Sequence, residues 1–370
     1  MYYNCFLMKP KPMNILVSPL DWGLGHASRC IPVIRQLVQA GHKVTLVGHG
    51  RSLVLLQKEF PSMETIETNG FSPSYSPTGN MVLHLLMLLP EFFISIYQDH
   101  RFLKKLIGRY NFDIVISDNR YGLWNKNIQS ILITHQVMIK TPVWLKLAEY
   151  PLYLASRMLI SRFDECWIPD TAESPGLSGD LSHKYSLPAN AKFIGPLSRF
   201  QQAELRGEHH ESKKKLLVII SGPEPQRSLF EDLVKHQLAG SGYDVTIISG
   251  KPEIENAAVS ESGITILPHL DATELSSLIS SSLLVICRSG YTSVMDLHAL
   301  GAKALFVPTP GQTEQLYLAG LFQNIGVALW RSQKELNLNA DIEEALKFTG
   351  FNTNIALPML TEAITDLKKK

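Results

Sequence analysis

Short apolar runs recur along the chain and alternate with segments of helical periodicity. In the first half these runs cover residues 14–18, 43–48, 113–118, 130–135 and 165–170. The runs are continuous rather than alternating, which is typical of strands buried on both faces of a parallel sheet. Between the first two runs, a helical pattern places Ile34, Leu37 and Val38 on one face. The pattern therefore predicts successive β-α-β units.

The same pattern starts again after a polar stretch. Residues 201–215, QQAELRGEHHESKKK, offer nothing to bury. Beyond them, apolar runs cover residues 215–222, 243–250, 264–269, 282–290 and 303–311. Two such series separated by a polar linker predict an α/β protein of two doubly wound, Rossmann-like domains that face each other across a cleft. The expected divisions are a first domain at 1–198, a linker at 199–214, a second domain at 215–350 and a C-terminal helix at 351–370.

The size and charge of the chain fit this division. With 370 residues, 45 % of them hydrophobic, the chain can bury two cores. Lysine and arginine number 35 against 34 aspartates and glutamates, so we expect no nucleic-acid partner. The four cysteines show no CxxC spacing, which predicts reduced thiols in the cytoplasm and no zinc site; they are Cys5, Cys30, Cys166 and Cys287.

Two apolar segments come close to the length of a membrane span. They cover residues 81–97 and 141–160, and proline and charge interrupt both. A spanning helix needs about 20 apolar residues, so we expect neither segment to cross a membrane. The stripe at 81–97 is more typical of a core than of membrane contact. Residues 1–12 lack the apolar core of a signal peptide, and we expect either a disordered extension there or an upstream start chosen in error.

The second domain contains turns in which a buried strand leads into a helix. A helix N-terminus presents unpaired N–H groups and partial positive charge, so it attracts phosphate. The first such turn, SGPEPQR at 221–227, offers Ser221 and Gly222, with Arg227 as a bidentate donor. Most turns of this kind bind nothing, so this signal is weak on its own.

The second turn, CRSGYTSVMDLHALG at 287–301, is more informative. A diphosphate at its helix start would lie against the amides of Ser289, Gly290 and Tyr291. Asp296 follows about two turns along the same helix, where a carboxylate can accept hydrogen bonds from ribose hydroxyls.

A third turn, FVPTPGQTEQ at 306–315, combines a strand, a Pro-Gly loop and two polar side chains. Glu314 and Gln315 stand side by side at its end. Close-set acceptors of this kind suit the adjacent hydroxyls of a sugar.

The first strand is followed by the glycine-rich turn SPLDWGLGHASR, residues 18–29. Gly23 and Gly25 leave open backbone space beside His26, at the strand edge that faces ligands in such folds. A histidine in a tight turn is often a core or capping residue. At a helix N-terminus, however, the dipole keeps the imidazole neutral, which suits a general base. These features favour a functional His26.

These motifs resemble a known family. The SRSG-like turn with its later acid, and the VP…P…Q loop, are similar to the donor half of nucleotide-sugar glycosyltransferases of the GT-B fold. The bacterial UDP-N-acetylglucosamine transferases of family 28 are the nearest group, and plant and animal UDP-glycosyltransferases share the layout. The resemblance covers most of the chain and is most specific at 287–315. In this fold the C-terminal helix crosses back to the first domain.

The resemblance implies that the second domain binds a UDP-sugar. Amides at 289–291 would hold the diphosphate, Asp296 the ribose, and backbone groups near His269 the uracil. Two departures are a first turn without the usual small residues and an aspartate where the family often has glutamate. The implied donor contacts are Ser221, Gly222, Arg227, His269, Leu270, Ser289, Gly290, Tyr291, Asp296, Gln312, Glu314 and Gln315.

The glycine-rich turn resembles a GxGHxxR signature of the same enzymes, matched by Gly23, Gly25, His26 and Arg29. By this resemblance His26 deprotonates the acceptor hydroxyl, and Asp118, at the end of DIVISD, orients the imidazole.

A second histidine also follows a strand of the first domain. His135 and Gln136 resemble a His-Glu-Gln triplet of the family without its acid. Both an acceptor contact and a structural role remain open for them.

The resemblance also implies the reaction. No DxD motif occurs in the chain, so we expect no metal or other cofactor, and an inverting transfer of N-acetylglucosamine or another hexose. We expect a lipid-linked acceptor, or another precursor of a cell-envelope glycan, at the cytoplasmic face of the membrane. Two alternatives are a non-hydrolysing UDP-sugar 2-epimerase and a sugar-nucleotide-binding subunit without chemistry. A dinucleotide oxidoreductase is disfavoured, because no GxGxxG follows either first strand.

Overall fold

The first domain is built on a parallel sheet. The computed structural model describes residues 11–68, 81–200, 212–222, 224–254, 258–261, 263–352 and 358–370. In the first sheet the strand order is β3-β2-β1-β4-β5-β6-β7, and every neighbouring pair is parallel. The strands are β1 Asn14–Pro19, β2 Lys43–Gly48, β3 Glu64–Glu67, β4 Ile114–Asp118, β5 Gln129–Ile133, β6 Glu165–Ile168 and β7 Ala191–Phe193.

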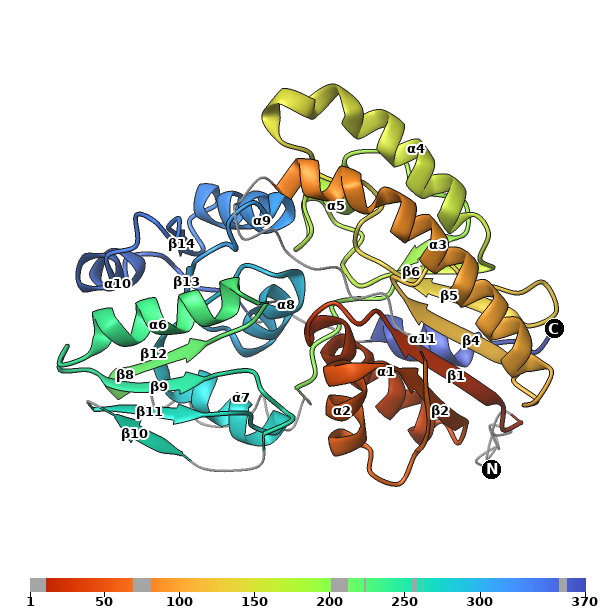
Figure 1. Cartoon of the computed structure of the whole chain (residues 1–370), viewed down its shortest axis with the longest axis horizontal. Coiled ribbons are helices and arrows are strands. Elements are labelled where there is room, and N and C mark those ends of the chain that lie inside the picture. The colour runs from red at the N-terminus through yellow and green to blue at the C-terminus, as the bar shows by residue number, and fades with distance from the viewer. Residues whose placement is uncertain are drawn as a thin grey trace, which may run out of the picture.

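Helices connect most of these strands, as is usual in a parallel sheet, whereas residues 119–128 between β4 and β5 contain none. In Figure 1 the long α3 and α4 cover the upper part of the first domain, while α1 and α2 lie below, near the second domain. The helical elements are α1 Gly25–Gln39, α2 Gly50–Glu59, α3 Met81–Ile107, the 3₁₀ helix η1 Val143–Ala148, α4 Glu149–Ile160 and α5 Asp180–His183.

The second domain repeats this architecture. Its strand order is β10-β11-β9-β8-β12-β13-β14, with only the edge pair β10–β11 antiparallel among the described strands. The strands are β8 Ser212–Ile219, β9 Asp244–Ile248, β10 Val259–Glu261, β11 Ile264–Leu267, β12 Ser282–Cys287, β13 Ala304–Phe306 and β14 Leu329–Trp330. The helices are α6 Gln226–Leu238, α7 Ala272–Ser281, α8 Tyr291–Leu300, α9 Thr313–Asn324, α10 Leu338–Ala345 and α11 Pro358–Thr365.

The prediction of two doubly wound α/β domains is therefore confirmed. The predicted disordered extension at 1–12 lies mostly outside the described residues, as do 201–211 of the predicted linker. Strand β8 begins at Ser212, inside the range expected to be linker. Its polar residues extend a strand because backbone pairing to β12 does not depend on their side chains.

The predicted packing of α1 is wrong at one position. Ile34 and Leu37 are fully buried, but Val38 is 44 % exposed. Around the helix axis Val38 lies between the buried Ile31 and Ile34, so its exposure comes from its place in the last turn of α1, which ends at Gln39.

Apolar side chains of both domains pack together where the domains meet. One continuous cluster contains Ala27 of α1 together with Leu275 of α7 and Val294 of α8. In Figure 1, α8 lies on the side of the second domain that faces α1. The two domains are thus held in direct contact at the ends of these helices.

The chain returns to the first domain at its C-terminus. Thr361 on α11 donates to Gln36 Oε1 over 3.4 Å, and the Lys368 amide donates to Gln129 Oε1 over 3.0 Å. Figure 1 shows α11 beside α1 and the first sheet. Among the described helices, none combines the length and apolarity needed to cross a membrane.

Candidate active site

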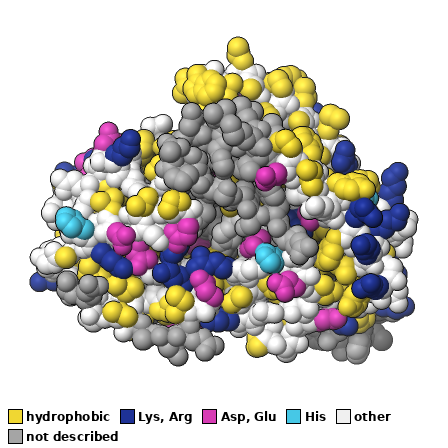
Figure 2. Space-filling model, viewed as in Figure 1, with side chains coloured by type: hydrophobic (Ala, Val, Ile, Leu, Met, Phe, Trp, Pro, Cys, Tyr) yellow, Lys and Arg dark blue, Asp and Glu magenta, His cyan; other side chains and the backbone are white. Residues whose placement is uncertain are grey.

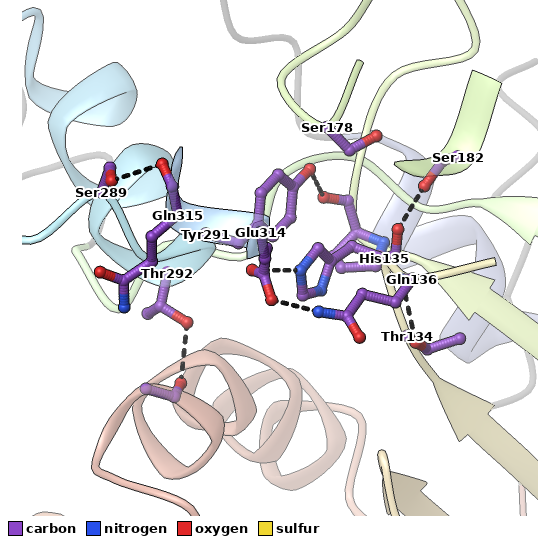
Figure 3. Close-up of polar contacts among 12 residues, drawn as sticks. Thr134, His135, Gln136, Ser178, Ser182, Ser289, Tyr291, Thr292, Glu314 and Gln315 are labelled. Atoms are coloured by element: carbon purple, nitrogen blue, oxygen red, sulfur yellow. Dashed lines mark hydrogen bonds and ion pairs between the residues drawn. The ribbon is translucent and has the colours of Figure 1, made fainter. Parts of the chain in front are cut away.

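The site lies where two helix N-termini from different domains meet. Gly25 is the first residue of α1, and Thr292 is the second residue of α8. The Thr292 hydroxyl donates to the Gly25 carbonyl oxygen over 3.0 Å (Figure 3). A Cβ at Gly25 would lie only 3.1 Å from that hydroxyl, so glycine permits this approach. Gly23 has φ +76°, a conformation that glycine adopts without strain.

His26 is held by a buried carboxylate. Its Nδ1 lies 2.7 Å from Asp118 Oδ1, and its side chain is 15 % exposed. Arg29 Nη2, which can only donate, also lies 2.9 Å from this Nδ1, but the shorter contact is with Asp118. Because an ionised carboxylate only accepts hydrogen bonds, we assign the proton to Nδ1 and the lone pair to Nε2. Burial alone would raise the pKa of Asp118, but the charges of Arg29 and His26 lower it to about 2.

Arg29 is fully enclosed, so it does not present a surface to an acceptor. Its Nε and one terminal nitrogen donate to the two oxygens of Asp118, a bidentate ion pair. Its other terminal nitrogen lies 3.1 Å from His135 Nδ1. Arg29 therefore connects the His26–Asp118 pair to the second histidine predicted from the sequence.

His135 and Gln136 belong to the first domain, but their side chains reach the second. His135 Nε2 lies 2.9 Å from Glu314 Oε1, and Gln136 Nε2 donates to Glu314 Oε2 (Figure 3). The His135 ring also stacks on Tyr291, with centroids 4.1 Å apart and planes within 6°. The predicted acceptor-side pair thus contacts two of the predicted donor-side residues.

The start of α8 has the features expected of an anion site. No side chain caps the helix at its N-cap, Gly290, and a Cβ added there would meet no atom within 4 Å. An uncapped first turn leaves its backbone N–H groups available to a ligand. Ser289 lies just before the helix and donates its hydroxyl to the Gln315 carbonyl over 2.8 Å. The predicted sugar residue Gln315 accepts from the Thr309 amide over 2.7 Å, which fixes its side chain beside the turn.

Two predicted donor contacts already have protein partners. The Asp296 carboxylate accepts from Ser198 Oγ at 2.8 Å and from Arg199 Nε at 3.1 Å. It therefore anchors the chain just before the linker, and ribose binding by this residue stays a prediction. The Arg227 guanidinium donates to the Ser249 carbonyl over 2.9 Å and also pairs with Glu224, so it does not project freely towards a phosphate.

The remaining residues predicted to contact the donor follow the carboxyl ends of strands β8, β11 and β13 of the second sheet. Gly222 has φ +101° and follows Ser221 in the turn after β8. Burial, aided by the charge of Arg199, lowers the pKa of His269 to about 4. Leu270 packs against the shared core, and Gln312 is the N-cap of α9.

Several residues at the domain interface had no signal in the sequence. Thr313 donates to the Lys140 carbonyl over 2.8 Å, and the Asp180 amide donates to the Tyr317 hydroxyl over 2.5 Å. Each contact joins segments more than a hundred residues apart, so local patterns carry no trace of them. Together they attach α9 to the first domain.

A pocket in the first domain opens beside the His26 turn. Leu20 and Trp22 from that turn line it, together with Phe92 of α3 and with Asn119 and Tyr121 after β4. Its wall combines these aromatic side chains with the charged side chains of Asp21, Asp99 and Arg120. Within the described part of the chain, no group of three or more His, Cys, Asp or Glu side chains is arranged to hold a metal ion.

The comparisons with known proteins agree with this geometry. Residues 217–367 match the glycosyltransferase family 28 C-terminal domain, and residues 13–127 match glycosyl transferase family 1. An uncharacterized glycosyltransferase of Methanosarcina mazei is 25 % identical over 337 residues, covering 85 % of this chain and 84 % of the relative. The chain is a glycosyltransferase with the GT-B fold.

A bacterial glycosyltransferase is similar to a shorter stretch of the chain. The UDP-N-acetylglucosamine–N-acetylmuramyl-(pentapeptide) pyrophosphoryl-undecaprenol N-acetylglucosamine transferase of Histophilus somni is 32 % identical over 93 residues, which are 23 % of this chain and 26 % of that enzyme.

Solved structures show the same fold. The kitacinnamycin glycotransferase superposes with a TM-score of 0.60 at 14 % identity, covering 96 % of this chain and 94 % of its own. MurG of Acinetobacter baumannii gives 0.53 at 14 % identity, covering 96 % and 100 %.

The two family matches contain the two halves of the site. The match at 13–127 contains the turn with His26 and the strand that ends at Asp118, and the match at 217–367 contains Ser289 and Glu314. The glycosyltransferase thus assembles its site from both matched regions.

Proposed function

We propose that this glycosyltransferase moves N-acetylglucosamine or another hexose from a UDP-sugar to an acceptor hydroxyl, with inversion and without a metal ion. The contact between Gly25 and Thr292 carries the proposal. It brings the helix that begins beside His26 against the helix expected to hold the donor diphosphate. A base and a leaving-group site at one interface are what a direct displacement needs.

His26 is the general base in this proposal. With its Nδ1 proton donated to Asp118, the lone pair of Nε2 is available to take the proton of an acceptor hydroxyl. Asp118 fixes the tautomer and the ring orientation and stabilises the imidazolium formed during the reaction. The activated oxygen attacks the anomeric carbon from the face opposite to the departing diphosphate, which inverts that centre.

The start of α8 stabilises the leaving UDP. As the glycosidic bond breaks, negative charge grows on the diphosphate. The uncapped amides beside Gly290 and the helix dipole are preorganised to receive that charge. This arrangement supports a reaction in which no metal bridges the phosphates.

An apolar surface supports a lipid-linked acceptor at the cytoplasmic membrane face. On η1, Leu147 is 95 % exposed and Trp144 is 71 % exposed, and Met158 on α4 is exposed as well. Hydrophobic side chains gather over α4 in Figure 2. Exposed Lys146 and Arg157 stand among them and would meet anionic lipid head groups. We propose that this surface, defined by Trp144, Lys146, Leu147, Arg157 and Met158, rests on the membrane.

A thermal-shift panel tests the donor class. UDP and UDP-sugars should raise the melting temperature by several degrees at saturating concentration, because they bind only the native protein. ADP-glucose serves as the matched control and should give a smaller shift. If no uridine nucleotide raised the melting temperature, the proposed donor would be wrong.

A further inference from the structure

His135 occupies a junction between the two domains. It follows β5 in the first domain, yet its ring stacks on Tyr291 at the start of α8, with centroids 4.1 Å apart. Its Nε2 lies 2.9 Å from Glu314 on α9, and its Nδ1 lies 3.1 Å from Arg29 on α1. Figure 3 shows the imidazole beside the Tyr291 ring, with one ring nitrogen facing the Glu314 carboxylate. One side chain therefore touches the helices expected to hold the diphosphate, the sugar and the base.

The partners of His135 define its tautomer. A guanidinium only donates hydrogen bonds, so Nδ1 must accept from Arg29. The ring proton then lies on Nε2 and is donated to Glu314. Burial lowers the pKa of His135, which agrees with a neutral ring.

Glu314 is held from both sides but keeps acceptor capacity. One carboxylate oxygen accepts from His135 and the other from Gln136. Each carboxylate oxygen has about two lone-pair sites, so each can accept one more hydrogen bond. The Glu314 side chain is 25 % exposed, which leaves those sites open to a ligand. The carboxylate is thus presented to the interface in a fixed orientation.

We propose that His135 is a positioning residue for the donor sugar, and that it acts through Glu314. The inference rests on the proposed function, in which Glu314 binds hydroxyls of the transferred sugar. The same histidine continues through Arg29 and Asp118 to His26, so the sugar ligand and the base are oriented by one connected network. Sugar recognition then requires both domains, whereas recognition of the nucleotide requires only the second.

Three substitutions separate the two contacts of His135. His135→Gln places an amide nitrogen near the Nε2 position and keeps a donor for Glu314. His135→Asn keeps an amide only near the Nδ1 position and loses that donor. His135→Ala loses both. Loss of a hydrogen bond to a charged group should raise the KM for the UDP-sugar about tenfold in the Asn and Ala variants, while Gln stays within about threefold.

Donor selectivity and UDP affinity complete the test. UDP-glucose and UDP-galactose differ only at one hydroxyl, so the ratio of their kcat/KM values should move towards one in the Asn and Ala variants. The Kd for UDP should stay within about twofold of wild type in all three, because the proposed diphosphate contacts are backbone amides of α8 and the proposed contacts of Glu314 are with sugar hydroxyls. A merely structural histidine would instead lower UDP affinity and melting temperature together, in the Gln variant as well, and that result would overturn the inference.

The other outcomes are equally decisive. If the Asn and Ala variants kept the wild-type donor KM and selectivity ratio, or raised only the acceptor KM, the positioning role would be wrong while the proposed function stood. If the wild-type protein bound neither UDP nor any UDP-sugar, the proposed function would fail and the inference with it.

Discussion

The hydroxyl of Thr292 donates to the carbonyl oxygen of Gly25 over 3.0 Å, and this bond joins the first turns of α1 and α8 across the domain interface. Two positive helix ends would repel each other if nothing lay between them, whereas an anion placed there is stabilised by both. The geometry therefore favours a negatively charged ligand at this junction, beside His26.

Gly25→Ala should damage catalysis without damaging the fold. The new Cβ would lie 3.1 Å from the Thr292 hydroxyl and push the two helices apart, while alanine itself favours a helix. We expect kcat/KM to fall at least tenfold with the melting temperature unchanged or slightly higher. Adding Thr292→Ala removes the clash and should restore part of the activity. Equal activity of the single variant and wild type would show that this close approach is not needed.

Asp118→Asn should abolish most of the turnover. An amide nitrogen facing His26 Nδ1 disfavours the tautomer that leaves Nε2 free, so we expect kcat to fall roughly 10²–10⁴-fold. The same change leaves the buried Arg29 without its counter-ion and should cost about 3 kcal/mol of unfolding free energy. Arg29→Met added to Asp118→Asn should recover much of this stability but none of the activity. Recovery of activity would contradict the role given to Asp118.

The ion pair also predicts how stability depends on pH. The pKa of Asp118 is about 2 in the folded protein, below the ordinary value of 3.8. A depressed carboxyl pKa stabilises the fold above the unfolded pKa, and that contribution disappears as pH falls from about 4 through 2. It amounts to about 2 kcal/mol. Denaturant unfolding at pH 6 and pH 3 should show a larger loss for wild type than for the Asp118→Asn, Arg29→Met variant. Equal losses would refute the linkage.

The exposed surface of η1 and α4 predicts membrane binding. Trp144→Ser with Leu147→Ser should reduce flotation with anionic liposomes several-fold while activity on a water-soluble acceptor is retained. Leu229→Ser is a matched control, because Leu229 is also exposed, at 51 %, but lies in the second domain. If the control lost as much binding as the double variant, or if wild type did not float at low salt, this surface would not be the membrane contact.

Much of the fold could be predicted because its strands are buried on both faces. Runs such as 14–18 and 282–290 coincide with β1 and β12 at the centres of their sheets. The strands without such a signal, among them β3, β10 and β14, are short and lie at sheet edges. An edge strand is paired on one side only, so its sequence need not be continuously apolar.

Only those parts of the site that depend on one strand and the turn after it could be predicted from the sequence. Each strand that ends in a glycine turn marks a place where a ligand can approach, and this pattern predicts His26 and Ser289 as site residues. His135 and Glu314 are 179 residues apart in the sequence, and their contact depends instead on how the two domains pack. Arg29 and Asp296 likewise have partners that only tertiary packing supplies.

The role of His26 as the base of a metal-independent sugar transfer is tested most directly by measuring UDP release from a saturating UDP-sugar. Wild type and His26→Ala are compared with and without acceptor, and again in the presence of EDTA. We predict acceptor-dependent UDP release by wild type that EDTA does not reduce, and a loss of at least a hundredfold in the variant with its Kd for UDP retained. Unchanged turnover in His26→Ala would contradict the account.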